Sequence, residues 1–117
     1  MRWWLAGLAL TVTPALVLAH AILTKTSLDT TAVHPDTATM VTFYFNAGIE
    51  KQLAKVTLVD AKGVARDLEI TPGAAPGEVT VALPPLAAGA YGLRYKVLAA
   101  DGHVTENVRR FTVTAAP

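Results

Sequence analysis

His20 is the residue whose position offers the most chemistry, because it directly follows a pattern typical of a secretory cleavage site. After cleavage it would be the first residue of the mature chain, with a free α-amine beside its imidazole. The amine and the ring Nδ1 of one residue can close a chelate ring around a metal ion without ordering a loop. Copper(II) is the ion that suits such a chelate best.

Two further potential ligands, Asp101 and His103, lie on either side of Gly102. In an extended backbone their side chains would emerge on the same face, and Gly102 allows the chain to bend between them. With His20 they would supply three nitrogens and one oxygen, a roughly planar set that suits one copper(II) ion, whereas zinc prefers a tetrahedron. A set without soft sulfur ligands favours copper(II) over copper(I). The alternative for this triplet is a surface Asp-Gly turn followed by an exposed histidine.

Residues 1–19 have the pattern of a cleavable signal peptide, which predicts export to the periplasm. Arg2 is followed by an uncharged run up to Leu18, and the segment ends in Val17-Leu18-Ala19. The alternative is an uncleaved anchor, because a run of about 17 residues approaches the lower limit for spanning a bilayer. Pro14 interrupts the run and favours cleavage. In an uncleaved chain His20 would carry an amide nitrogen in place of an amine, and the proposed chelate would be lost.

The remaining 98 residues, 20–117, are enough for one domain with a modest core. Without Arg2 they contain nine basic and nine acidic side chains, so the mature chain is formally neutral. This balance gives no indication of nucleic-acid binding or of an anionic membrane surface. The sequence has no cysteine, which excludes thiolate metal sites, cysteine nucleophiles and stabilising disulfides.

Short apolar runs separated by Gly, Pro and Asp predict an all-β fold, a Greek-key antiparallel β-sandwich of the Ig-like or cupredoxin-like kind, with about seven strands. The alternation of Val41, Phe43 and Phe45 indicates a half-buried strand. Tyr91, after Leu86-Ala87-Ala88-Gly89-Ala90, is expected to form a tyrosine corner. Ala61-Lys62-Gly63 is expected to close a hairpin. The expected strands are Ile22 to Thr26, Met40 to Asn46, Lys55 to Val59, Arg66 to Ile70, Glu78 to Leu83, Tyr91 to Leu98 and Val108 to Thr114.

The mature sequence resembles the CopC family of small periplasmic copper-binding proteins. The features that carry the resemblance are His20 after the signal, the strand Val41 to Asn46, Leu86-x-x-Gly89-x-Tyr91, Asp101-Gly102-His103 and a final strand around Phe111. The resemblance implies a β-sandwich that binds copper(II) through its terminal amine, its first histidine, and the Asp and His of the triplet, here His20, Asp101 and His103. It also implies copper sequestration or delivery, with a separate inner-membrane copper transporter of the CopD type as a partner.

Several residues depart from the family pattern or lie outside the expected site. Met40 is the one methionine of the mature chain, so we expect no copper(I) site. Many members carry an acidic residue soon after the Phe-rich strand. Here Asn46-Ala47-Gly48 follow that strand, and Glu50 is the nearest carboxylate. His34 is expected to be an exposed loop histidine. Arg109 and Arg110 are expected to be solvated strand residues.

Copper binding of this kind requires no catalysis, and we expect no enzyme. Two alternatives from other classes are a metal-free Ig-like interaction module and an oxidative copper enzyme with a histidine brace, as in lytic polysaccharide monooxygenases. The second needs an open coordination position and a substrate-binding surface, and this short chain has few aromatic residues to build one.

Overall fold

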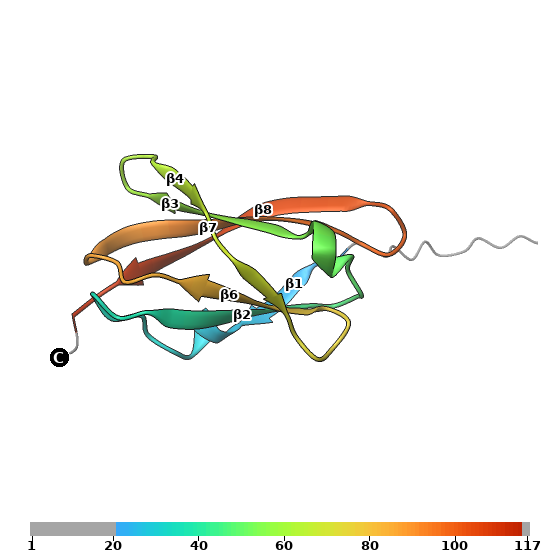
Figure 1. The fold of residues 1–117 in the computed structure, drawn as a ribbon, viewed down its shortest axis with the longest axis horizontal. Helices are drawn as coiled ribbons and strands as arrows, with labels where there is room; N and C mark the ends of the chain where they lie inside the picture. Colours follow the sequence, from blue (N-terminus) through green and yellow to red (C-terminus); the bar gives the residue numbers. More distant parts are fainter. Residues whose placement is uncertain (1–20, 116–117) are drawn as a thin grey trace, which may run out of the picture.

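The computed structural model describes residues 21–115, which form a sandwich of two antiparallel sheets, as Figure 1 shows. One sheet has the strand order β1-β2-β6-β5, and the other has the order β4-β3-β7-β8. The first sheet contains β1 (Leu23–Thr26), β2 (Thr39–Phe45), β6 (Glu78–Leu83) and β5 (Ile70–Pro72). The second contains β4 (Ala65–Asp67), β3 (Lys55–Asp60), β7 (Gly89–Leu98) and β8 (Val104–Val113). The predicted all-β sandwich is therefore confirmed.

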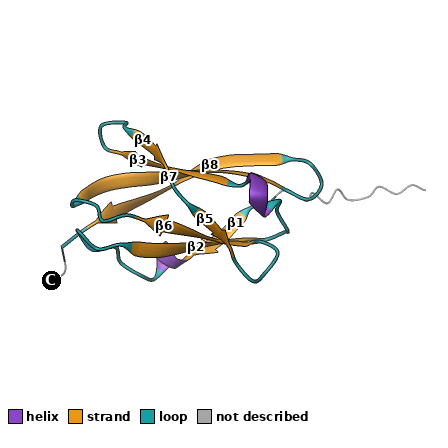
Figure 2. Cartoon of the chain, in the orientation of Figure 1, coloured by secondary structure: helices purple, strands orange, loops and turns teal. Residues whose placement is uncertain are grey.

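The helical content of residues 21–115 is two short 3₁₀ turns, η1 (Ser27–Asp29) and η2 (Lys51–Leu53), drawn in purple in Figure 2. No helix in this part of the chain is long and apolar enough to cross a bilayer. The predicted signal peptide, residues 1–19, lies outside the described residues, and so does His20.

Alternating side chains from both sheets form the core. Val41, Phe43 and Phe45 of β2 are buried, while the residues between them are partly exposed, as the alternation predicts. The ring of Tyr95 from β7 meets Phe43 and Phe45 edge to face, with centroids 5.5 and 5.6 Å apart. Burial raises the pKa of the Tyr95 phenol. Aromatic packing between the sheets therefore stabilises a sandwich whose sequence contains no cysteine.

Two local predictions about turns are confirmed. The β3–β4 hairpin turns at Ala61-Lys62-Gly63, where Gly63 has a φ of 83° that favours glycine. The carboxylate of Asp60 accepts hydrogen bonds from the backbone N–H groups of Lys62 and Val64, at 2.8 and 2.9 Å, and so closes this turn. The Tyr91 hydroxyl donates to the carbonyl of Ala87 at 2.7 Å, which is the predicted tyrosine corner.

Two strand predictions are wrong in their bounds. The single strand expected over Arg66 to Ile70 is two strands, β4 and β5, which belong to different sheets, and the chain crosses between them at Leu68 and Glu69. The last strand begins at Val104, four residues before the predicted Val108, because the whole segment pairs with β7. The long β7–β8 hairpin positions the Asp101-Gly102-His103 triplet at its tip.

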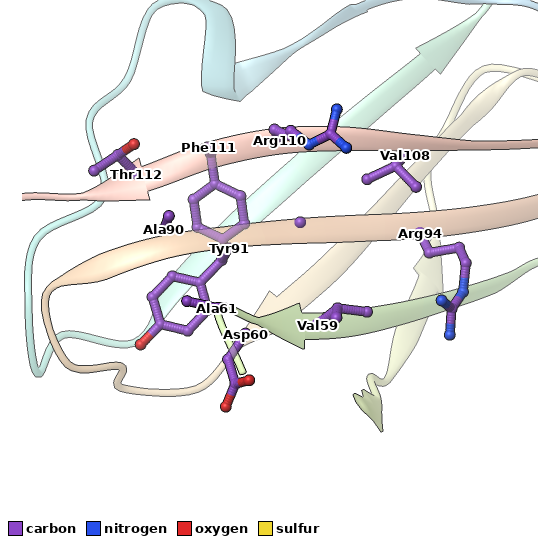
Figure 3. A pocket seen from close by; sticks show the side chains of 11 residues that line it. Val59, Asp60, Ala61, Ala90, Tyr91, Arg94, Val108, Arg110, Phe111 and Thr112 are labelled. Carbon is purple, nitrogen blue, oxygen red and sulfur yellow. The ribbon is translucent and has the colours of Figure 1, made fainter. Parts of the chain in front are cut away.

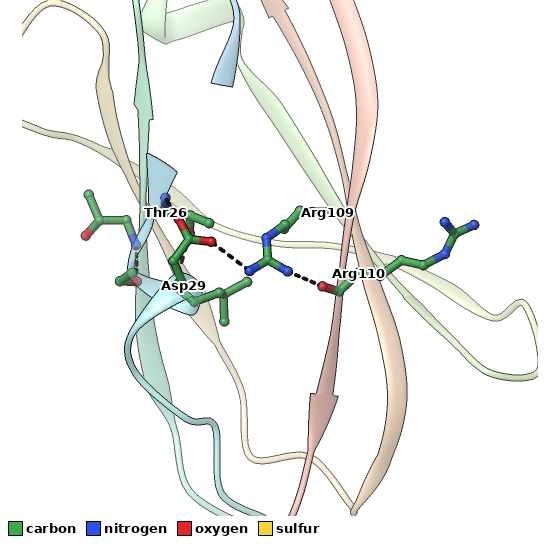
Figure 4. Close-up of polar contacts among 7 residues, drawn as sticks. Thr26, Asp29, Arg109 and Arg110 are labelled. Carbon is green, nitrogen blue, oxygen red and sulfur yellow. Dashed lines mark hydrogen bonds and ion pairs between the residues drawn. The ribbon is translucent and has the colours of Figure 1, made fainter. Parts of the chain in front are cut away.

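The prediction that Arg109 is merely solvated is also wrong. Its guanidinium forms an ion pair with Asp29 at 2.9 Å, and the same group donates to the carbonyl of Arg110 (Figure 4). Asp29 also accepts a hydrogen bond from the backbone N–H of Thr26 at 3.1 Å. The hydrogen bond from Thr26 and the one from Arg109 hold the pKa of the Asp29 carboxyl below its usual range. This contact links η1, which follows β1, to β8, and so joins the two sheets.

Candidate metal centre

The Asp101-Gly102-His103 triplet forms a tight turn at the tip of the β7–β8 hairpin. Gly102 has a φ of 92°, and its N–H donates to the carbonyl of Ala99 at 2.9 Å. The backbone N–H of His103 donates to Oδ1 of Asp101 at 3.0 Å. The expectation of an extended backbone here is therefore wrong. The bend at Gly102 brings the two side chains together, because a residue with positive φ folds the chain back on itself.

The carboxylate and the imidazole of this turn are in direct contact. Oδ2 of Asp101 lies 2.8 Å from Nδ1 of His103, and the two side chains are 30% and 61% exposed respectively. A carboxylate at Nδ1 favours the tautomer that is protonated there, and this tautomer has its lone pair on Nε2. The arrangement orients an imidazole nitrogen and supplies an anionic oxygen within the same turn. Both are donor types that bind copper(II).

The beginning of the described chain lies at the same end of the sandwich as this turn. Ala21 is fully buried, and both backbone polar groups of Ile22 are paired with Asn46. The N–H of Ile22 donates to Oδ1 of Asn46 at 2.8 Å, and the N–H of Asn46 donates to the carbonyl of Ile22 at 2.9 Å. The loop after Asn46 contacts the hairpin, because the N–H of Ala100 donates to the carbonyl of Gly48 at 3.3 Å. In Figure 1 the blue start of β1 and the tip of the β7–β8 hairpin lie at the same end.

The comparison with protein families decides the family of this chain. The model of the CopC domain matches residues 23–114, which is most of the chain. The chain belongs to the CopC family.

Solved CopC-type structures have the same fold. The crystal structure of CopC from Methylosinus trichosporium OB3b superposes with a TM-score of 0.70 at 28% sequence identity, over 84% of this chain and 97% of that chain. PcoC, a methionine-rich copper resistance protein from Escherichia coli, gives a TM-score of 0.64 at 21% identity, over 82% of this chain and 100% of that chain. Its selenomethionine form gives 0.57 at 23% identity, over 80% and 99%. No curated protein sequence matches the chain.

Within this CopC fold, the structure brings together two of the three sequence-predicted ligands, Asp101 and His103. The third, His20, lies outside the described residues. Among residues 21–115 themselves, no group of three His, Asp or Glu side chains could hold a metal ion. Glu50 is at the same end of the sandwich, since its N–H donates to the carbonyl of Leu98 at 2.9 Å.

His34 lies at the opposite end of the sandwich and is exposed, as predicted. Its Nδ1 is 3.4 Å from the carbonyl of Thr114, the residue that follows β8. The ten residues of β8 separate this end from His103, and at a rise of about 3.3 Å per residue they span about 30 Å. His34 therefore cannot share an ion with His103.

The sequence did not predict that Asn46 pairs with the start of the described chain. An asparagine after an alternating strand is an ordinary strand end. Its pairing with Ile22 spans 24 residues and depends on the register of β1 against β2. Its place directly after the Phe-rich strand marks a strand end but does not identify Ile22 as its partner.

Proposed function

We propose that this chain is an exported, periplasmic copper(II)-binding protein that sequesters or delivers copper. It holds one copper(II) ion as cargo through the α-amine and imidazole of His20, the carboxylate of Asp101 and the imidazole of His103. The proposal takes cleavage to occur after Ala19, so that His20 is the first residue. It involves binding and release, with no catalytic step, and delivery to a separate membrane transporter of the CopD type.

The observation that carries the proposal is the Asp101–His103 contact in a chain that belongs to the CopC family. Proteins of this fold include one described as a copper resistance protein. The donor set fits the ion, because neutral nitrogen donors and a carboxylate suit copper(II) and no thiolate is available. Ala21 is fully buried and Ile22 is hydrogen-bonded to Asn46, so the described chain begins at the end of the sandwich that carries the triplet.

The proposal is tested by titrating the mature protein with copper(II) and following nitrogen hyperfine coupling by electron paramagnetic resonance. Replacing His103 with alanine should weaken copper(II) binding by more than about 100-fold, because the loss of even an outer partner of a ligand costs about 10–100-fold. His34→Ala is the matched control, since it also removes one histidine but at the opposite end. Equal affinities of the His103→Ala variant and the unmodified protein would remove His103 from the site.

A further inference from the structure

The outer face of the β4-β3-β7-β8 sheet carries side chains that the copper proposal does not use. Leu58 and Leu93 point into the core, so the residues next to them in each strand point outward. The strand register places Val59, Gly92 and Arg110 side by side in one outward row. The adjacent row contains Thr57, Arg94 and Val108, and the row beyond it contains Lys55, Lys96 and Glu106. Arg94 and Arg110 are thus diagonal neighbours, with Gly92 and Val108 completing the square.

This face is hollowed where its side chains are small. A cavity of about 540 Å³ has Ala61, Ala90 and Gly92 among its lining residues, and it extends to Arg94 and Arg110. Figure 3 shows both arginines near Val108, and Tyr91 and Phe111 further along the same two strands. A Cβ atom at position 92 would come within 3.0 Å of Cγ1 of Val108, so glycine keeps this floor open. A smaller hollow of about 240 Å³ shares Arg94 and adds Lys55, Lys96 and Glu106.

The charge of these two adjoining hollows is predominantly positive. Four cationic side chains line them: Lys55, Arg94, Lys96 and Arg110. Of the acidic lining residues, Asp60 is engaged in closing the β3–β4 turn, and Glu106 lies directly across from Lys96. Lys55 forms an exposed ion pair with Asp67 at 3.7 Å. Neither Arg94 nor Arg110 forms an ion pair with any side chain among residues 21–115.

We propose that this face docks an acidic peptide segment of a partner protein, with carboxylates on Arg94 and Arg110. Guanidinium groups bind carboxylates in a bidentate fashion and are favoured where such recognition is needed. The two hollows share Arg94 and continue to Arg110 on one side and Lys96 on the other, so a ligand that contacts both is an extended chain and not a single small anion. Val59 and Val108 offer apolar contact beside the charges, and Val108 is 41% exposed. A second copy of the chain would present the same positive face, and like charges would repel.

The probe is an acetylated, amidated Glu-Glu-Val-Glu-Glu peptide added to ¹⁵N-labelled mature protein. We expect shifts of the backbone amides of Gly92, Arg94, Val108 and Arg110, with a dissociation constant in the region of 1 mM or below. The double variant Arg94→Glu/Arg110→Glu should bind at least about tenfold more weakly. Lys25→Glu/Lys51→Glu is the matched control: it makes the same change in net charge at residues outside the lining of both hollows and should leave binding within about twofold. Amide spectra of both variants establish that they are folded.

Several further results decide the nature of the ligand. An isosteric Gln-Gln-Val-Gln-Gln peptide should bind more weakly than the acidic peptide. Raising the salt concentration should weaken binding of the acidic peptide. Glutarate or inorganic phosphate binding as tightly as the peptide would reduce the face to a small-anion site and overturn the proposal. Binding to phosphatidylglycerol vesicles in preference to the peptide would assign the face to a membrane surface instead. Dimerisation through this face in sedimentation, or an absence of shifts at about 5 mM peptide, would also overturn it.

Discussion

Asp101 has two separate tasks in the proposed site, and a single substitution can distinguish them. Its Oδ1 accepts the backbone N–H of His103 and so holds the turn, while Oδ2 contacts the imidazole. Asp101→Asn keeps an oxygen acceptor for the turn but removes the charge. We expect this variant to retain the hairpin amide shifts of the parent, yet to bind copper(II) more than about tenfold more weakly. Asp101→Ala should change the hairpin amide shifts and also weaken copper(II) binding. A full-affinity Asp101→Asn variant would show that the carboxylate is no ligand.

Asn46 acts on the site through the chain start and not through the metal. Its side chain accepts the N–H of Ile22, and its own N–H pairs with the carbonyl of the same residue. Asn46→Ala removes only the first of these two bonds. We expect copper(II) affinity to fall by about tenfold, as for other outer partners of a site, with the nitrogen hyperfine pattern unchanged. Asn46→Asp keeps an oxygen acceptor and should restore most of the affinity. A loss of affinity that Asp does not rescue would contradict this positioning role.

The residues of the candidate site differ in how far the sequence could predict them. Asp101 and His103 are two positions apart, and a glycine between them predicts a bend, so their proximity is a local property of the chain. The bend that Gly102 allows is present and the extended geometry is not, because the carboxylate closes a turn with the backbone N–H of His103. Asn46 with Ile22, and Asp29 with Arg109, meet only through strand pairing or sheet packing across 24 and 80 residues. No local pattern encodes such pairs.

At the scale of the elements, strands with strict alternation were predicted well and strands with mixed polarity were not. β2 alternates Val, Phe and Phe with polar residues, and its burial follows that order. The first half of β8, Val104 to Asn107, has little apolar character and becomes a strand because β7 offers a partner for every residue. The segment between β4 and β5 changes sheets, and Leu68, which packs against the core, is part of that crossing. Pairing and sheet crossing depend on the neighbours of a strand more than on its own residues.

The contact between η1 and β8 should make stability depend on pH. The pKa of Asp29 lies below its reference of 3.8, because the hydrogen bonds from Thr26 and Arg109 favour the carboxylate. A lowered folded pKa contributes stability that is present above the unfolded pKa and is lost as pH falls through the folded value. The free energy of unfolding should therefore differ between the parent and Asp29→Asn at about pH 6, and this difference should shrink towards about pH 2. Urea unfolding of the two proteins at each of these pH values measures the difference in free energy.

Arg109→Gln and Arg110→Gln provide the matched comparison for this contact. Arg109 bonds to Asp29, whereas the side chain of its exposed neighbour Arg110 does not. Arg109→Gln should reproduce part of the Asp29→Asn effect, and Arg110→Gln should leave the pH dependence of unfolding unchanged. Equal effects of the two arginine substitutions would indicate a general change in net charge and not the specific bond.

On the scale of the whole molecule, the sandwich separates the proposed copper end from the cationic face. The copper end combines the β7–β8 turn with the chain start, while the hollows lie on the outer surface of the β4-β3-β7-β8 sheet. The fold class was predictable because alternation and turn residues act locally, whereas the strand order of each sheet was not, since β6 pairs with β2 and β7 with β3 across long loops. Function at two separate surfaces predicts that each can be lost without the other.

Selective acetylation of the α-amine of His20 tests this independence together with the role of the terminal amine. The buried anchor at Ala21 and its neighbour Ile22 stay unchanged, so thermal unfolding should remain within about 2 °C of the parent. The acetylated nitrogen is an amide that no longer chelates copper(II) with the His20 imidazole, so copper(II) affinity should fall by more than about 100-fold. Binding of the acidic peptide should be unaffected. If the acetylated chain kept full copper(II) affinity, the amine would be no ligand; if acetylation weakened binding of the peptide as well as copper(II), the two surfaces would be coupled through the sandwich.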